Sequence, residues 1–191
     1  MKVLNGLVKF NSGSPQFRIM ESLDAAAPRY IYYSQSDLLD DLTGMRSAQG
    51  ESKEVRTMDK VHTLSRGDVV FSLVTGKAAI IRPEHEGYLY TQNYIRLLPT
   101  EAIHAAFLVY LLNEDKFIRK QFFIGLQGSQ VLKYTLQQLK RICIDKLPPL
   151  EQQRQIGELY LKQLHLTAVK NQAAELEKLV CLAKLAEASK R

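Results

Sequence analysis

The chain has 191 residues, of which 46% are hydrophobic and 24% charged, so it is long enough for one buried core but short for two full domains. No run of eighteen apolar residues occurs and the first ten residues lack a signal-peptide pattern, so we expect no membrane association. The 2 cysteines indicate free thiols and a cytoplasmic location, and the net charge of +6 favours a polyanionic partner without requiring one.

The N-terminal part of the chain has the pattern of short strands, turns and one helix. Alternating apolar residues predict a strand over Leu4–Phe10, followed by a turn rich in Asn, Ser, Gly and Pro. A short helix is predicted over 36–42, with Ser34 or Ser36 as its cap and Gly44 as its end.

The middle of the chain changes from an exposed loop to a β pattern. Met45–Lys60 carries charges of both signs and almost no apolar residue, which indicates a long exposed loop that is either functional or disordered. Strands are then predicted over Val69–Val74, Ala78–Arg82 and Tyr88–Leu98, with a tight turn over 75–77. Three such strands in sequence favour an antiparallel meander over a βαβ unit.

Helices follow the predicted strands. Glu101–Asn113 has apolar residues at spacings of three and four, which predicts a helix packed on the sheet. A second helix is predicted over Lys116–Phe123, followed by a polar loop at 128–130. Thr135 begins a capping-box pattern, which predicts a brief helix before a last strand over Ile142–Ile144. This order of elements predicts an α+β fold with antiparallel strands.

The Pro148-Pro149 pair ends the preceding element and divides the chain into a domain over residues 1–147 and a helix over 148–191. From 150 to about 189 strong helix formers dominate, with no proline and a single glycine near the start. Such a helix is about 55–60 Å long, whereas the first domain is roughly 35–40 Å across. We therefore expect the helix to project from the domain.

The predicted helix carries an apolar seam with heptad spacing, the pattern of a coiled coil. The expected dimerisation residues are Leu159, Leu166, Ala173 and Val180 at one heptad position and Val169, Leu176 and Ala183 at the other, with Lys162 interrupting the second series. Further leucines lie outside the seam, which favours additional contacts with another protein. The alternative is a helix that folds back on its own domain.

The sequence lacks the motifs of common catalytic sites. It contains no phosphate-binding loop, no nucleophile elbow, no dinucleotide fingerprint and no amino-methyltransferase signature. The four histidines show no metal-ligand spacing. We therefore expect a non-catalytic protein without a cofactor or a metal.

Several segments resemble the specificity subunits of type I restriction-modification systems. Residues 147–156, Leu-Pro-Pro-Leu-Glu-Gln-Gln-Arg-Gln-Ile, are similar to the junction that precedes a conserved helix in that family, with Gln152 where the family has Glu. Residues 64–72 and 76–80 resemble its Gly-Asp strand and hairpin, and 92–97 its next strand. Gly128-Ser129-Gln130, with 136–142 after it, is similar to the segment just before the junction.

The resemblance implies a mixed α/β target-recognition domain that enters the DNA major groove through loops, plus a conserved coiled-coil helix. It also implies methyltransferase subunits that bind along such helices and carry the catalysis, and a restriction subunit that joins them. A full specificity subunit has two such domains and two such helices, whereas this sequence has one of each. We therefore expect a half subunit that pairs antiparallel with a second copy and reads a bipartite palindrome in double-stranded DNA.

Contacts to DNA require basic and amide side chains on exposed loops. The candidates on the predicted loop are Arg46, Ser47, Gln49, Lys53, Arg56 and Lys60. A second group follows in the later turns: Lys77, Thr91, Gln92, Asn93, Ser129, Gln130 and Lys133.

Two other functions remain open on the sequence alone. One is a coiled-coil interaction protein whose domain binds protein, for example an orphan regulator of a restriction system. The other is an RNA-binding module, which is less favoured because stacking platforms of exposed aromatic residues are not evident.

Overall fold

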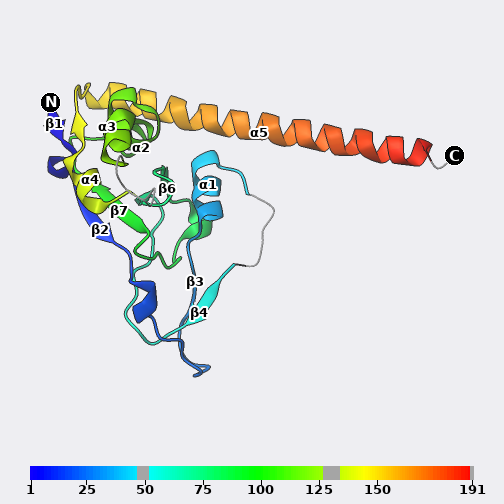
Figure 1. Cartoon of the computed structure of the whole chain (residues 1–191), viewed down its shortest axis with the longest axis horizontal. Coiled ribbons are helices and arrows are strands. Elements are labelled where there is room, and N and C mark those ends of the chain that lie inside the picture. The colour runs from blue at the N-terminus through cyan, green and yellow to red at the C-terminus, as the bar shows by residue number, and fades with distance from the viewer. Residues whose placement is uncertain (47–51, 127–133, 190–191) are drawn as a thin grey trace.

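The computed structural model describes residues 1–46, 52–126 and 134–189. A body of strands and short helices lies beneath one end of a long helix, α5 (Leu150–Ala188), which extends well past it (Figure 1). With 39 residues, α5 is about 58 Å long. The predicted α+β fold and the long C-terminal helix are confirmed. Within the described ranges, no helix has the length and apolar content needed to cross a bilayer.

The main sheet has four antiparallel strands in the order β2 (Val8–Ser12), β7 (Tyr94–Pro99), β5 (Val69–Ser72) and β6 (Ala78–Ile80). The predicted antiparallel pairing is confirmed, but the meander order is wrong because β7 pairs with β5 and not with β6. The free edge of β6 is occupied instead by the buried amide of Asn113. That amide accepts from Ala78 N–H at 2.8 Å and donates to Ala78 O at 2.9 Å.

Two predicted strands are shorter than expected. The strand predicted over Leu4–Phe10 is divided into a 3₁₀ turn over Leu4–Gly6 and the strand β2. Leu4 and Leu7 are both buried, and two residues three apart can point the same way in a 3₁₀ turn but not in a strand. The strand predicted over Tyr88–Leu98 begins only at Tyr94, because residues 88–93 form isolated bridges and a turn.

The chain ends of the body meet in a second sheet. β1 (Lys2–Val3) pairs antiparallel with β8 (Cys143–Ile144), which confirms a last strand at the predicted place. Leu4 N–H donates to Ile142 O directly beside this pair, at 2.8 Å. The N-terminus therefore lies next to the start of α5.

The short helices begin and end at residues that their caps identify. α1 (Gln35–Thr43) is capped by Ser34 and ends at Gly44 in the left-handed region, as predicted. α4 (Leu136–Arg141) has the predicted capping box at its start. α3 is found over Lys116–Leu126. α2 (Ala105–Glu114) starts later than the predicted Glu101, because residues 100–103 form a turn before it.

The larger core cluster lies between the main sheet and the helices α2 and α3, and a second cluster, with Leu38 of α1 against Val70 and Ala79, lies on the other face of the sheet. α2 buries the stripe that its apolar spacing predicted, with Phe107, Leu108 and Leu112 at its centre. Phe122 of α3 stacks on Phe71 of β5 with ring centroids 5.5 Å apart. Burial of these large side chains is the main contribution to the stability of the body.

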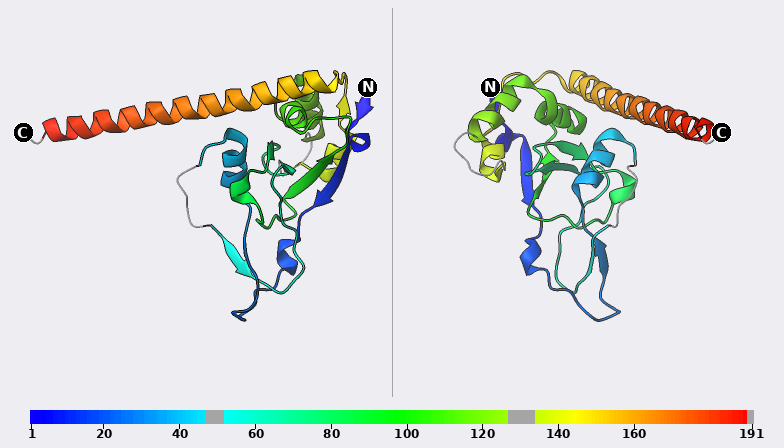
Figure 2. Two further views of the ribbon diagram at one scale, coloured as in Figure 1. Left: turned by 180° about the vertical axis from the view of Figure 1, so that it is seen from behind. Right: turned by 45° about the vertical axis from the view of Figure 1, so that its right-hand side comes forward.

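α5 both packs on the body and projects from it. Its first turns lie on α2, and Gly157 approaches so closely that a methyl group there would overlap the backbone of Ala106 and Phe107. His165 then contacts Thr43 O at the end of α1, at 2.9 Å. From residue 169 to 189 every residue of the helix is exposed. The turned views show the same free half (Figure 2).

Candidate nucleic-acid interface

The end of the body farthest from α5 is a small lobe formed by residues 15–32 and 52–61, which we call the distal lobe. Its centre is an antiparallel ribbon of β3 (Arg29–Ile31) and β4 (Glu54–Arg56), and a 3₁₀ turn over Gln16–Arg18 lies beside it (Figures 1 and 2). The ribbon corrects the prediction of a loop over Met45–Lys60. β4 forms there because Val55 has a buried place opposite Tyr30 in the partner strand.

Backbone hydrogen bonds hold the distal lobe together although it buries few side chains. Ser22 N–H donates to Arg56 O at 2.8 Å, and Thr57 N–H donates to Pro28 O at 3.1 Å. Met20 N–H donates to the carboxylate of Asp59 at 2.7 Å. The segment before β3 is therefore fixed along the end of β4.

The predicted residues Thr91, Gln92 and Asn93 lie where the distal lobe joins the main sheet. Thr91 is buried and forms a bridge with Ser14. The side-chain oxygen of Gln92 accepts from Gln16 N–H at 2.7 Å, and Asn93 O accepts from Leu73 N–H. Thr91 and Gln92 therefore join the start of the lobe to the sheet, and Asn93 contacts the segment that follows β5.

Two arginines face each other across the ribbon. The register pairs Arg29 with Arg56 on the exposed face, an arrangement of like charges that destabilises a strand pair. Glu54 forms a bidentate ion pair with Arg29, while Arg56 donates to Ala25 O at 2.9 Å. The hydrogen bond and charge of Glu54 raise the pKa of Arg29, and those of Arg29 lower the pKa of Glu54. Glu54 therefore pairs with Arg29, and Arg56 has a backbone carbonyl as its partner.

Two predicted lysines extend this basic surface. Lys53 lies with its ammonium 5.2 Å from the centre of the Tyr32 ring, and Lys60 is exposed just after β4. Burial, together with the charge of Glu21, raises the pKa of Tyr32. Among the residues that the structure describes, no carboxylate lies within ion-pair distance of Lys53, Arg56 or Lys60.

Two further predicted contact residues, Arg46 and Lys77, do not lie on the distal lobe. Arg46 follows α1 and lines a small hollow with Arg82 and His85. Lys77 is close to Glu114 at the C-terminal end of α2, 3.4 Å away, on the side of the body that carries α5. Five further residues lie outside the described ranges: Ser47, Gln49, Ser129, Gln130 and Lys133.

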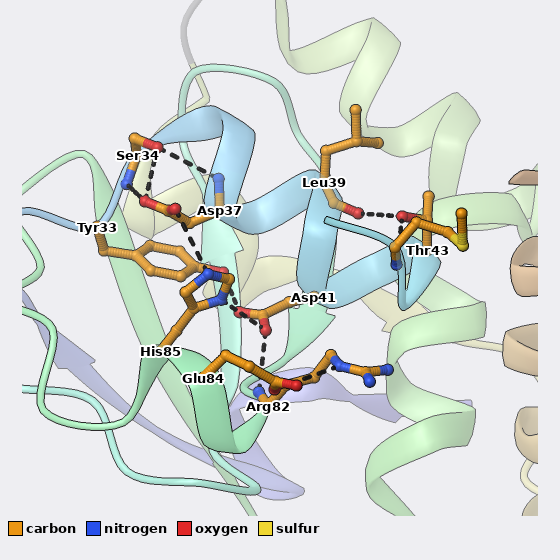
Figure 3. Close-up of polar contacts among 10 residues, drawn as sticks. Tyr33, Ser34, Asp37, Leu39, Asp41, Thr43, Arg82, Glu84 and His85 are labelled. Atoms are coloured by element: carbon orange, nitrogen blue, oxygen red, sulfur yellow. Dashed lines mark hydrogen bonds and ion pairs between the residues drawn. The ribbon is translucent and has the colours of Figure 1, made fainter. Parts of the chain in front are cut away.

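A buried histidine fixes α1 beside the root of the distal lobe (Figure 3). His85 Nδ1 lies 2.9 Å from the Asp41 carboxylate, and Nε2 lies 3.5 Å from that of Asp37. Tyr33 O–H donates to Asp41 at 2.7 Å, and Arg82 N–H donates to it at 2.9 Å. α1 is thereby linked to the segment that follows β3.

The electrostatics of this cluster favour a charged imidazole. Burial alone would lower the pKa of His85, but the hydrogen bond and charge of Asp41, with the charges of Asp37 and Asp40, outweigh it, so the pKa is raised. Burial and then the Asp41 carboxylate raise the pKa of Tyr33 well above its usual value, so its hydroxyl remains a donor. The arrangement holds α1 in place and presents no nucleophile.

Sequence reasoning missed several residues of the distal lobe. Arg29 becomes a candidate contact residue only because it pairs with Arg56 in the ribbon, and Arg56 lies far along the chain. The exposed side chains of Phe17, Met20, Leu23 and Met58 were also missed. The sequence contained a signal for them. These large apolar residues occur among Ser, Pro, Asp and other turn-forming residues, where no helix or strand provides a face that could bury them.

The outer face of α5 carries the predicted seam. Leu159, Leu166 and Val169 are exposed, and so are the seam residues farther along the helix. The residues that touch the body, such as Gln153, Gly157 and Leu161, lie on the opposite face. Over the described residues, no group of three or more His, Cys, Asp or Glu side chains could hold a metal ion.

A family model described as "Type I restriction modification DNA specificity domain" matches residues 4–178, which include the body, the distal lobe and most of α5. A comparison with curated proteins gives no match.

Solved structures share the fold at low identity. The HsdS subunit from Thermoanaerobacter tengcongensis is 16% identical with a TM-score of 0.57, covering 91% of this chain and 39% of that one. A structure described as the basis of "complex assembly and conformational transition of the type I R-M system" has a chain 18% identical with a TM-score of 0.62, covering 96% and 42%. The S subunit from M. genitalium is 14% identical with a TM-score of 0.50, covering 95% and 41%. This chain thus spans about two fifths of the length of the solved chains that it matches.

Proposed function

Because this chain belongs to the family of type I restriction-modification DNA specificity domains, we propose that it reads double-stranded DNA with its distal lobe and carries no catalytic step itself. Methylation and cleavage are then performed by a methyltransferase subunit and a restriction subunit that it directs. Residues 1–147 provide recognition, residues 148–191 provide assembly, and the cytoplasm, where these partners meet DNA, is the site of action.

The pairing of Arg29 with Arg56 is the observation that carries this proposal. Like charges at paired positions of two strands oppose folding, and in the free protein Glu54 and Ala25 O engage the two guanidinium groups. A phosphate or a guanine edge converts the same pair into a favourable bidentate site. The two-stranded ribbon that holds the pair has the width that a DNA major groove accepts. Lys53 and Lys60 then lie where they can contact phosphates on either side.

A second copy of the chain is the proposed partner for the α5 seam. In an antiparallel pair centred on Asn171, Leu159, Leu166 and Ala173 of the first series each meet a residue of the second, and Val180 meets the partner's Lys162. Leu166 meets the partner's Leu176, and Val169 meets the partner's Ala173. Such a dimer places two distal lobes at opposite ends, so the target is a bipartite palindrome whose spacer the helix length determines.

The methyltransferase subunit is proposed to dock along the part of α5 that the seam leaves uncovered. Leu179, Leu182 and Leu185 are exposed there and lie outside the seam. An exposed apolar stripe of this kind marks a protein contact.

The test is co-expression of this chain with a type I methyltransferase subunit in a host free of adenine methylation, followed by sequencing that detects modified adenine. The expected result is methylation confined to one bipartite palindromic motif. The double variant Arg29→Gln/Arg56→Gln should abolish it, while Lys9→Gln, an exposed lysine of β2 outside the lobe, should retain it.

The possible results separate the parts of the proposal. Methylation of a motif that is not palindromic would contradict the proposed pairing with a second copy but would support the DNA-reading role. A methylome unchanged by the chain would remove the DNA-reading role and favour a coiled-coil interaction protein. Equal methylation by both variants would place recognition outside the ribbon.

A further inference from the structure

The distal lobe exposes large apolar side chains that nothing in the body covers. Phe17, Met20 and Met58 are 79%, 75% and 71% exposed, and Leu23 is fully exposed. Folding leaves these side chains in water, so their burial contributes nothing to stability. Arg18 lies 5.5 Å from the centre of the Phe17 ring and partly shields it, which leaves Met20, Leu23 and Met58 as the free group.

These three side chains are held in place by ordered backbone. Met20 N–H donates to the carboxylate of Asp59, the residue after Met58, so this bond joins the two segments that carry Met20 and Met58. Leu23 lies in a turn where Asp24 N–H donates to Ser22 Oγ at 3.2 Å and Asp24 accepts from Ala26 N–H at 2.9 Å. The backbone of Ser22 is also bonded to Arg56, so the turn is joined directly to the ribbon. A contact made by these side chains therefore costs rotamer freedom but little backbone entropy.

The charges around the apolar group are suited to a polyanion. Arg29 and Arg56 lie on the adjoining ribbon, where Arg56 O accepts from Ser22 N–H, and Lys60 follows Met58 by two residues. Three nearby carboxylates are engaged within the lobe: Glu54 by Arg29, Asp59 by Met20 N–H, and Asp24 by its own turn, while Glu21 is exposed beside Met20. An apolar group beside Arg56 and Lys60 suits a major groove, which has phosphates along its edges.

The apolar group that a major groove offers is the 5-methyl group of thymine, because the other edge groups are hydrogen-bond donors and acceptors. We propose that Met20, Leu23 and Met58 contact thymine methyl groups, so that the target sequence contains A·T pairs read through van der Waals contact. This inference rests on the proposed DNA-reading function and names a part of the chemistry by which the distal lobe selects its sequence.

The experiment begins with selection of binding sites from a pool of random DNA duplexes by the full chain. Each dT in the selected site is then replaced by dU, which removes only the methyl group, and the Kd is measured for the wild type and for Met20→Ala, Leu23→Ala and Met58→Ala. At least one replacement should weaken wild-type binding about fourfold. The same replacement should have no effect on one of the three alanine variants, because that variant has already lost the contact.

Leu39→Ala is the matched control, since Leu39 is exposed on α1 outside the distal lobe. It should keep both the wild-type Kd and the wild-type loss on dU. Equal binding of dT and dU duplexes at every position, a selected site without A·T pairs, or a dU effect that persists in all three alanine variants would each overturn the inference and leave the DNA-reading function intact. A pool without any enriched sequence would instead remove the proposed function, and this inference with it.

Discussion

Gly157 of α5 lies directly on Ala106 of α2, so that a methyl group at position 157 would overlap the backbone of the neighbouring helix. A glycine inside a helix costs about 1 kcal/mol relative to alanine, and α5 is otherwise built from strong helix formers. The close approach of the two helices explains why α5 has a glycine at this position. Gln153, one turn earlier, reinforces the contact by accepting from His104 N–H and donating to Pro148 O.

The substitution Gly157→Ala should therefore lower the free energy of unfolding by about 1–3 kcal/mol, although alanine favours the helix itself. Urea denaturation followed by circular dichroism measures the change. Gly6→Ala is the control, because no atom lies within 4 Å of a Cβ at that position. An increase in stability for Gly157→Ala would mean that α5 does not dock on α2 in this way.

The elements that sequence analysis predicted well are those fixed by neighbouring residues. The caps of α1 and α4 lie within a few residues of the groups that they bond, and α5 is determined by composition over its whole length. In the main sheet, by contrast, the edge of β6 is occupied by Asn113, which bonds Ala78 across 35 positions of the chain. No local pattern contains that contact.

In the candidate site, too, sequence analysis found what neighbouring residues determine and missed what depends on distant ones. Lys53, Arg56 and Lys60 were found because they stand in a charged segment, and they do lie together on the distal lobe. β4 itself was missed, since Val55 is a single apolar residue between Glu54 and Arg56. Its partner Arg29 was missed with it. Thr91 and Gln92 have the residue types of DNA contacts, but only the structure reveals their bonds to Ser14 and Gln16.

The buried His85 should make the stability of the protein depend on pH. Its folded-state pKa is raised by Asp41 and its neighbours, so the charged form contributes stability that is fully present below the ordinary value of about 6.5. That contribution is lost as pH rises through the folded-state pKa. Denaturant titrations at several pH values above 6.5 should therefore show falling stability.

The variant His85→Gln should flatten this dependence, because an amide cannot gain the proton. His62→Gln is the comparison variant, since His62 is an exposed histidine of the same chain, and it should keep the wild-type fall. A wild-type curve that rises over the same range would contradict the assignment of the charge to His85.

Charged substitutions in the seam of α5 should separate a dimer into monomers without unfolding the body. Leu166→Glu, Val169→Glu, Leu176→Glu and Val180→Glu each place a carboxylate at a position that the body does not touch. Light scattering gives the mass, and circular dichroism gives the retained fold. Lys162→Glu replaces one charge by another at a position that already interrupts the seam, so it should have the smallest effect. A dimer that survives all four changes would exclude the seam as its interface.

The role of Gln92 can be distinguished from that of a base contact. Gln92→Ala removes the acceptor of Gln16 N–H, so the junction between the distal lobe and the main sheet should open more often. Hydrogen exchange at the Gln16 amide should become faster, and DNA affinity should fall equally on specific and random duplexes. A loss confined to one base pair of the target, with exchange unchanged, would instead identify Gln92 as a base-reading residue.

The salt dependence of DNA binding should separate the phosphate contacts of the distal lobe from its base contacts. Each phosphate contact contributes about 0.9 to the slope of log K against log salt concentration. Lys53→Gln and Lys60→Gln should each reduce the slope by about that amount and weaken specific and random duplexes alike. Arg29→Gln or Arg56→Gln should mainly reduce the preference for the selected sequence, because a bidentate contact to guanine carries about 1–3 kcal/mol of discrimination. The opposite outcome would be a change of sequence preference in the lysine variants and a change of only the slope in the arginine variants. It would mean that the lysines read bases and that the ribbon face with Arg29 and Arg56 lies against the phosphate backbone.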